Sequence, residues 1–211
     1  MKEFDLSVHL NKIKEEKVST LKELVLKNRS VRRFKQNQSV SMETLKELVD
    51  LARLSPSAAN KQPLKYVISN ESDKNKRIFP HLAWAGYLSD WKGPAEGEQP
   101  AAYIIICVDK TIAKEDINCD HGIAAQSILL GAVEKGLGGC IIGSINRDVL
   151  QTDLNLPDYL KIMLVLALGV PNEQITIEKI DNKHDIKYWR DPNNVHHVPK
   201  RILDEIIYIT K

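Results

Sequence analysis

Positively charged side chains gather in two segments that lie far apart in the sequence. The first, KNRSVRRFK at 27–35, holds five lysine or arginine residues and no carboxylate, and the second is the pair Lys200 and Arg201. Both side-chain types bind phosphate oxygens through charge-assisted hydrogen bonds. If the fold brings the two segments together they form a phosphate site, and if it does not they are solvated surface charges.

A loop with a different chemistry occupies residues 55–63. Its sequence, SPSAANKQP, is rich in residues that form turns and offer backbone or side-chain hydrogen-bonding groups. A strand, LKYVIS at 64–69, is predicted directly after it. Loops at the ends of such elements often hold ligands, so this loop is a second candidate for binding.

Motifs for hydrolysis, metal binding and dinucleotide binding are missing. The sequence contains no GxSxG, HExxH or CxxC pattern. His196 and His197 are adjacent, and on an extended chain they point to opposite faces, which argues against a shared metal ion. GLGGCIIG at 136–143 lacks the G-x-G-x-x-G spacing and follows a helix, so a Rossmann nucleotide site is not predicted.

The elements that must position these groups centre on a helix that begins at Asp120. It has no polar face between Gln126 and Glu134, and a helix that is apolar on all sides is buried. The glycines of GLGG end it. The apolar runs at 101–109 and 162–170 predict two strands that are covered on both faces.

Shorter patterns predict the remaining elements. Helices are expected after Thr20, which forms a capping box with Glu23, and after the cap residues Ser41 and Asn146. Four further expectations are a polar helix followed by an apolar one at 71–92, a short strand at 140–145, an irregular tail at 183–201 and a terminal strand at 202–209.

The composition fits one soluble globular domain, with residues 1–18 as an N-terminal extension and 19–211 as the domain. A net charge of +2 is too small to indicate nucleic acid or an acidic membrane as a partner. Three cysteines without metal-type spacing indicate reduced thiols. No secretion signal or membrane span is recognised, so we expect a cytoplasmic protein.

Five segments of the sequence, taken together, resemble the FMN-dependent nitroreductase family, and they occur in the order and at the spacing of that family. They are RSVRRF at 29–34, SPSAANKQP at 55–63, the strand at 101–109, the small-residue helix with GLGGCIIGSI, and PKRILDEII at 199–207. The run WAGYLSDWKGPAEGEQPAAYI is similar to a small subgroup of uncertain physiological substrate. The resemblance implies an α+β fold with a central mixed β-sheet wrapped by helices, and an intertwined homodimer with FMN at the interface.

The resemblance also implies the residues that bind FMN. Arg29 would lie toward the phosphate, and Arg32 near the pyrimidine edge, where it stabilises the reduced ring. No side-chain acid or base is implied, and no metal. The full implied set is Arg29, Ser30, Arg32, Pro56, Ser57, Ala58, Asn60, Ile142, Gly143, Lys200 and Arg201, with Pro56 to Asn60 reaching the flavin of the partner chain. No residue is assigned to the ribityl chain.

The activity implied is transfer of hydride from NAD(P)H through flavin N5 to nitroaromatics, quinones or similar acceptors, by a ping-pong mechanism. Three alternatives remain open at this point. One is a flavin-fragmenting or dehalogenating enzyme of the same fold, another is a non-catalytic flavin-binding dimer, and the third is a structural dimer without a cofactor. In the last case the basic segments would face solvent.

Overall fold

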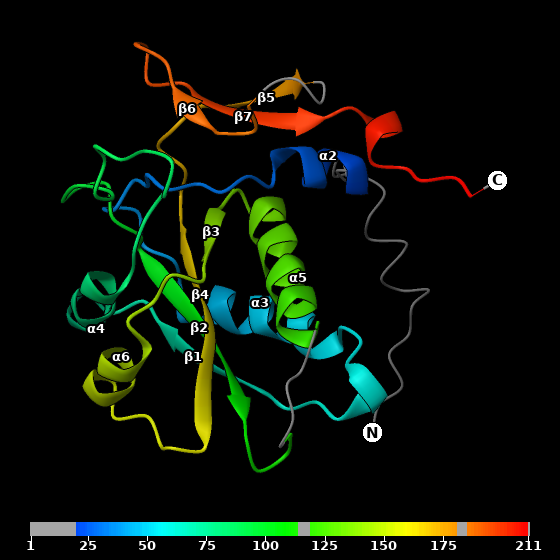
Figure 1. Cartoon of the computed structure of the whole chain (residues 1–211). Coiled ribbons are helices and arrows are strands. Elements are labelled where there is room, and N and C mark those ends of the chain that lie inside the picture. The colour runs from blue at the N-terminus through cyan, green and yellow to red at the C-terminus, as the bar shows by residue number, and fades with distance from the viewer. Residues whose placement is uncertain (1–19, 114–118, 181–184, 211) are drawn as a thin grey trace, which may run out of the picture.

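A four-stranded antiparallel sheet forms the centre of the computed structural model, which describes residues 20–113, 119–180 and 185–210 (Figure 1). The predicted extension at 1–18 lies outside these ranges. The strand order is β1 (Leu64–Ser69), β2 (Ala102–Asp109), β4 (Leu160–Gly169) and β3 (Gly138–Ile142). The two apolar runs predicted as covered strands are β2 and β4, and they occupy the middle of the sheet.

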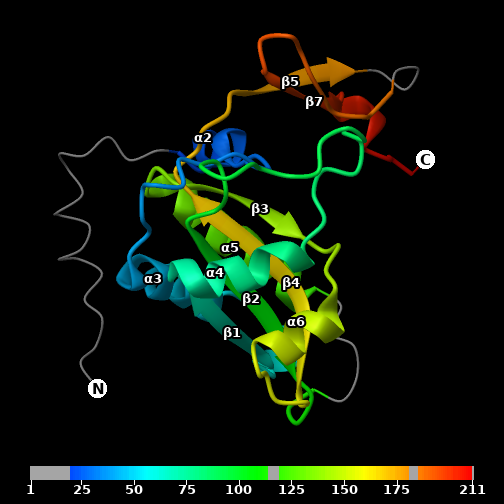
Figure 2. The ribbon, with the colours of Figure 1, turned by 90° about the vertical axis from the view of Figure 1, so that its left-hand side faces the viewer.

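Alternate side chains of β2 enter two separate cores. Ile104 and Ile106 pack on one face, against α3 (Met42–Leu54) and α5 (Asp120–Glu134). Tyr103 and Ile105 pack on the other face, in the cluster that includes Ile78 of α4 (Ser72–Ile78) and Leu150 of α6 (Arg147–Asp153). Because successive side chains of a strand point to opposite faces, a strand with helices on both sides must be apolar at every position. Figures 1 and 2 show these layers.

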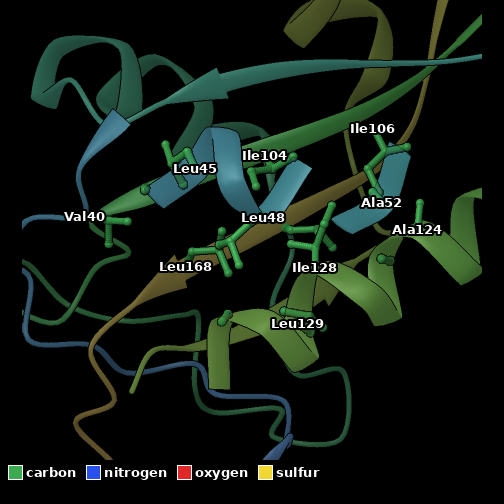
Figure 3. Packing of buried hydrophobic residues seen from close by; sticks show 14 of the residues in the cluster. Val40, Leu45, Leu48, Ala52, Ile104, Ile106, Ala124, Ile128, Leu129 and Leu168 are labelled. Carbon is green, nitrogen blue, oxygen red and sulfur yellow. The ribbon is translucent and has the colours of Figure 1, made fainter. Parts of the chain in front are cut away.

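The central helix α5 packs closely on α3, as Figure 3 shows. A Cβ atom on Gly131 would lie 2.3 Å from a methyl group of Leu51, so any larger residue there would displace the Leu51 side chain. Ala125 and Leu129 are buried within this chain, while Ile123 and Gln126 are exposed. The expected burial on all sides is therefore incomplete in a single chain.

The predicted helix caps are confirmed at two sites. In α2 (Leu21–Lys27) the backbone N–H of Thr20 donates to Glu23 at 2.8 Å, and the N–H of Glu23 donates to the Thr20 hydroxyl at 3.3 Å. Ser41 caps α3 by accepting from the N–H of Thr44 at 3.0 Å. Asn146 precedes α6 without a side-chain hydrogen bond to it.

A second sheet of three strands lies next to α2 (Figures 1 and 2). Its order is β5 (Ile175–Ile180), β7 (His196–Arg201) and β6 (Trp189–Arg190), with β5 and β7 parallel and β6 and β7 antiparallel. An irregular tail was expected at 183–201, and this expectation is wrong for residues 189–190 and 196–201, which form β6 and β7. Pro199 is tolerated because β6 pairs only with the first two residues of β7, so no neighbour on that side needs its missing N–H.

Two other expectations are wrong. Residues 79–92 form a short 3-10 helix, η2 (Phe79–His81), and then turns, because Pro80 cannot continue α4. The segment at 202–209 is not a strand: η3 (Leu203–Glu205) and an extended end replace it, and Ile206 and Tyr208 stay exposed. Among the described residues, no helix is long and apolar enough to cross a membrane.

Candidate functional site

The first basic segment leaves α2 and runs along the edge of β3. Ser30 forms a parallel bridge with Gly139, and the N–H of Val31 donates to the Gly139 carbonyl at 2.9 Å. The named strands of the central sheet pair antiparallel, and this isolated bridge adds one parallel contact at the edge. The backbone N–H groups of Arg32 and Arg33 both donate to the carboxylate of Glu173. The segment is therefore held on both sides.

The two basic segments converge on one cavity of about 330 Å³. Arg29, Ser30 and Arg32 contribute from one side and Lys200 of β7 from the other. Arg201 is the next residue on β7 and does not line the cavity, since neighbouring side chains of a strand face opposite ways. The remaining lining residues are Asn28, Gln126, Leu129, Gly139, Ile141, Tyr188, His196 and Val198.

A second cavity, of about 190 Å³, adjoins the first and shares Arg32 and Ile141 with it. Ile142 and Gly143 line it at the end of β3, and Trp84 lines it from the loop that follows η2. The other lining residues are Ala83, Ala85, Gly86, Cys140 and Ser144. Arg32 thus lies where the two cavities meet.

Both cavities are lined by residues with an unpaired buried donor. Nε of Arg29 and Nε1 of Trp84 have no hydrogen-bond partner among the described residues. Burial lowers the pKa of Arg29, although a guanidinium remains charged at neutral pH. Leaving a buried donor unsatisfied costs about 1–3 kcal/mol. Both nitrogens are closed off from solvent, so they are not themselves the donors that a ligand in these cavities would meet.

Three groups surround the side chain of Arg32. Its Nη1 lies 3.3 Å from the Ser30 carbonyl oxygen and 3.3 Å from Nε2 of His196. Its Cζ lies 4.9 Å from the centre of the Tyr188 ring. Burial, followed by the charges of Arg32 and Arg190, lowers the pKa of His196 to about 4, so His196 is neutral at pH 7.

The loop at 55–63 lies apart from these cavities. The loop adjoins the start of α5. The basic segment follows α2, which lies toward the other end of α5 (Figure 1). The hydroxyl of Ser57 donates to buried Asp120 at 2.6 Å, and the N–H of Ala58 donates to the same carboxylate at 3.1 Å. Pro56 and Ser57 line a separate cavity of about 140 Å³. Asn60 has φ of 53°. One chain does not bring this loop to Arg32.

The residues near Arg32 that the sequence patterns did not indicate come from distant segments. Tyr188 reaches it from the chain just before β6 and His196 from β7, while Glu173 reaches its backbone from the turn after β4. From the sequence, the pair His196–His197 suggests only a possible metal site. In the described part of the chain, no group of three or more His, Cys, Asp or Glu residues is arranged to hold a metal.

The fold and the cavities define an α+β protein in which Arg29, Arg32 and Lys200 line one cavity. The chain belongs to the nitroreductase family, whose sequence profile, described as "Nitroreductase family", matches residues 25–170. A proposed NADH dehydrogenase/NAD(P)H nitroreductase of Archaeoglobus fulgidus is 23% identical over 180 residues, which cover 82% of this chain and 94% of the relative.

Solved structures share the same fold. A nitroreductase family protein from Streptococcus pneumoniae TIGR4 superposes with a TM-score of 0.67 and 18% identity, and the match covers 90% of this chain and 100% of that one. An FMN-dependent nitroreductase from Clostridium difficile R20291 superposes with a TM-score of 0.58 and 23% identity, covering 72% of this chain and 87% of that one. The predicted family and α+β fold are therefore confirmed.

Proposed function

We propose that this protein is an NAD(P)H-dependent oxidoreductase that binds FMN and reduces nitroaromatics, quinones or similar acceptors. The convergence of Arg29, Arg32 and Lys200 on one cavity carries the proposal. The two basic segments lie more than 160 residues apart in the sequence and meet at this cavity. Basic segments that served only as solvated surface charges would have no reason to converge. The name of the Archaeoglobus relative and that of the Clostridium neighbour support the same activity and cofactor.

The donors along the site fit FMN. Arg29, Ser30 and Lys200 supply positive charge and hydrogen-bond donors for a phosphate in the first cavity. The second cavity, with the backbone of Ile142 and Gly143, offers space for a flat ring beyond Arg32. Arg201 adds positive charge near Lys200 from the other face of β7. FMN is favoured over FAD because the sequence has no fingerprint for an adenosine.

The bound flavin would supply the hydride chemistry, and the chain supplies position and charge. A guanidinium at the pyrimidine edge stabilises the negative charge that develops there on reduction, which places Arg32 in that role. Removing such a group typically raises a barrier by about 3 kcal/mol. Trp84 would line one side of the space that the ring occupies. No general acid or base is required of the protein.

The loop at 55–63 enters the proposal through a homodimer. Pro56, Ser57, Ala58 and Asn60 lie too far from Arg32 in one chain to share a cavity with it. In the proposed dimer they reach the cofactor of the partner. Asp120 holds the start of this loop through Ser57 and so fixes its conformation. We also propose a cytoplasmic location, where the three cysteines stay reduced.

The absorbance spectrum of the purified protein tests this proposal. We expect a yellow protein whose visible band bleaches when NADH or NADPH is added without oxygen, and recovers when a quinone or nitroaromatic is added. Denaturation should release FMN rather than FAD. A flavoprotein that does not bleach would be a non-catalytic binder, and one whose flavin is consumed would be a fragmenting enzyme. A colourless protein that takes up no FMN would contradict the proposal.

A further inference from the structure

Arg32 and His196 form a contact that fixes which nitrogen of the imidazole carries the proton. Nη1 of Arg32 lies 3.3 Å from Nε2 of His196. A guanidinium has only donors, so Nε2 must be the acceptor and must carry no proton. The remaining proton of the neutral ring is then on Nδ1, which has no hydrogen-bond partner among the described residues.

The surroundings of His196 keep it neutral. Its side chain is buried, with 1% of the residue exposed. The charged groups that act on it are Arg32, Arg190 of β6 and, from the opposite face of β7, His197, and all of them disfavour a second proton. The ring of Tyr188 packs on it at 5.2 Å between centroids and contributes no charge. Glu173, the nearby carboxylate, is bound by Arg190 and by backbone N–H groups.

Tyr188 and His196 together determine where the Arg32 guanidinium lies. Tyr188 lies under Cζ at 4.9 Å, and His196 accepts from Nη1, so the guanidinium is fixed in plane and in direction. All three side chains line the first cavity. Without the acceptor on His196, Arg32 would keep its charge but gain rotational freedom.

We propose that neutral His196 is a positioning residue that accepts a hydrogen bond from Arg32 and holds its guanidinium toward the flavin. This inference rests on the proposed function, because the group that Arg32 is positioned to meet is the bound FMN. His196 acts only through Arg32. Substituting His196 should therefore weaken FMN binding when Arg32 is present and have little effect when Arg32 is absent.

A double-mutant cycle tests this dependence with FMN itself as the probe. Apoprotein of the wild type, His196→Leu, Arg32→Ala and the double variant would be titrated with FMN at pH 7, and the dissociation constant read from quenching of flavin fluorescence. We expect His196→Leu to raise the constant about tenfold. In the Arg32→Ala background the same substitution should change it by less than about twofold.

Two further variants separate positioning from structural support. His196→Gln carries a carbonyl that can accept from Arg32, so it should bind FMN within about threefold of the wild type. His197→Leu is the matched control, because its ring faces the other side of β7 and contacts Glu178 at 2.7 Å. It should leave FMN binding unchanged. The reduction potential of the bound flavin should fall in His196→Leu and stay near the wild-type value in His196→Gln.

The outcomes distinguish this inference from the proposed function. If wild-type apoprotein takes up no FMN, the proposed function fails and this inference fails with it. If the wild type binds FMN and His196→Leu binds equally well, only the role of His196 is wrong. Equal losses in both backgrounds would show that His196 supports the fold and does not act through Arg32.

Discussion

Glu173 and Arg190 form a buried ion pair, with 3.0 Å between Oε2 and Nη2 and a Glu173 side chain that is 1% exposed. The same carboxylate accepts from the backbone N–H groups of Arg32 and Arg33. Arg190 in turn lies over the ring of Trp91, with its Cζ 4.2 Å from the centroid. One carboxylate thus joins the basic segment, the second sheet and the loop that follows η2.

Replacing Glu173 by alanine should lower the free energy of unfolding by about 3 kcal/mol, because the Arg190 charge and two backbone donors lose their partner. Urea unfolding measures this change. The control is Glu178→Ala, which removes an exposed partner of His197 and should cost less than about 1 kcal/mol. Similar losses in the two variants would mean that the Glu173 pair contributes no more than a surface contact.

The second prediction compares Arg32 with its neighbour. Arg32 lines both cavities, whereas Arg33 lines neither and pairs with Glu98 at 3.4 Å. Arg32→Ala should weaken FMN binding and slow reduction of the flavin by NAD(P)H about 100-fold, which corresponds to about 3 kcal/mol of barrier. Arg33→Ala should change the rate little. Stopped-flow absorbance gives both rates, and equal effects would remove Arg32 from its proposed role.

Local patterns in the sequence predicted those parts of the fold that depend on neighbouring residues. The capping box of Thr20 and Glu23 needs only four consecutive residues, and the burial of β2 follows from its unbroken apolar run. The helix expected up to residue 92 failed because Pro80 outweighed the apolar pattern around Trp84. The final apolar segment failed as a strand because no strand pairs with it in the part of the chain that the structure describes.

The site was only partly predictable, because local patterns do not reveal contacts between residues that are far apart in the sequence. The R-S-x-R segment and Lys200 could be proposed from their residue types, and the structure places them around one cavity. The contacts that orient Arg32 join residues 141–164 positions apart, and no local pattern indicates them. Alternation along β7 does require His196 and His197 to face opposite ways, so it indicates that one of them turns inward.

The third prediction concerns stability in acid. The pKa of His196 is lowered to about 4 in the folded state and returns to about 6.5 on unfolding, so the unfolded chain binds the extra proton first. The contribution of His196 to stability is therefore present above about pH 6.5 and is lost as the pH falls toward 4. Urea unfolding at pH 7, 5 and 4 should show a steeper loss in the wild type than in His196→Gln. Parallel losses would mean that His196 titrates normally.

The fourth prediction concerns the dimer. The segment that includes Ile206, Tyr208 and Ile209 is apolar and exposed, with Tyr208 91% exposed, and a contiguous apolar patch of this kind favours contact with a second copy. Light scattering should find a dimer for the wild type. Tyr208→Asp combined with Ile209→Asp should favour the monomer and release FMN, while Thr210→Asp should change neither. A wild-type monomer that remains saturated with FMN would show that the loop at 55–63 need not reach a partner.

The fifth prediction is the kinetic order. The two cavities share Arg32 and Ile141 as lining residues, and the sequence offers no Rossmann unit to hold NAD(P)H elsewhere while a second substrate binds. A hydride passes only when the donor and acceptor atoms are about 3–3.5 Å apart in an aligned pose. The oxidising substrate must therefore occupy the space that the nicotinamide leaves. Double-reciprocal plots against NAD(P)H at several quinone concentrations should be parallel, with each substrate inhibiting competitively at high concentration. Intersecting lines would require a ternary complex and a second substrate site.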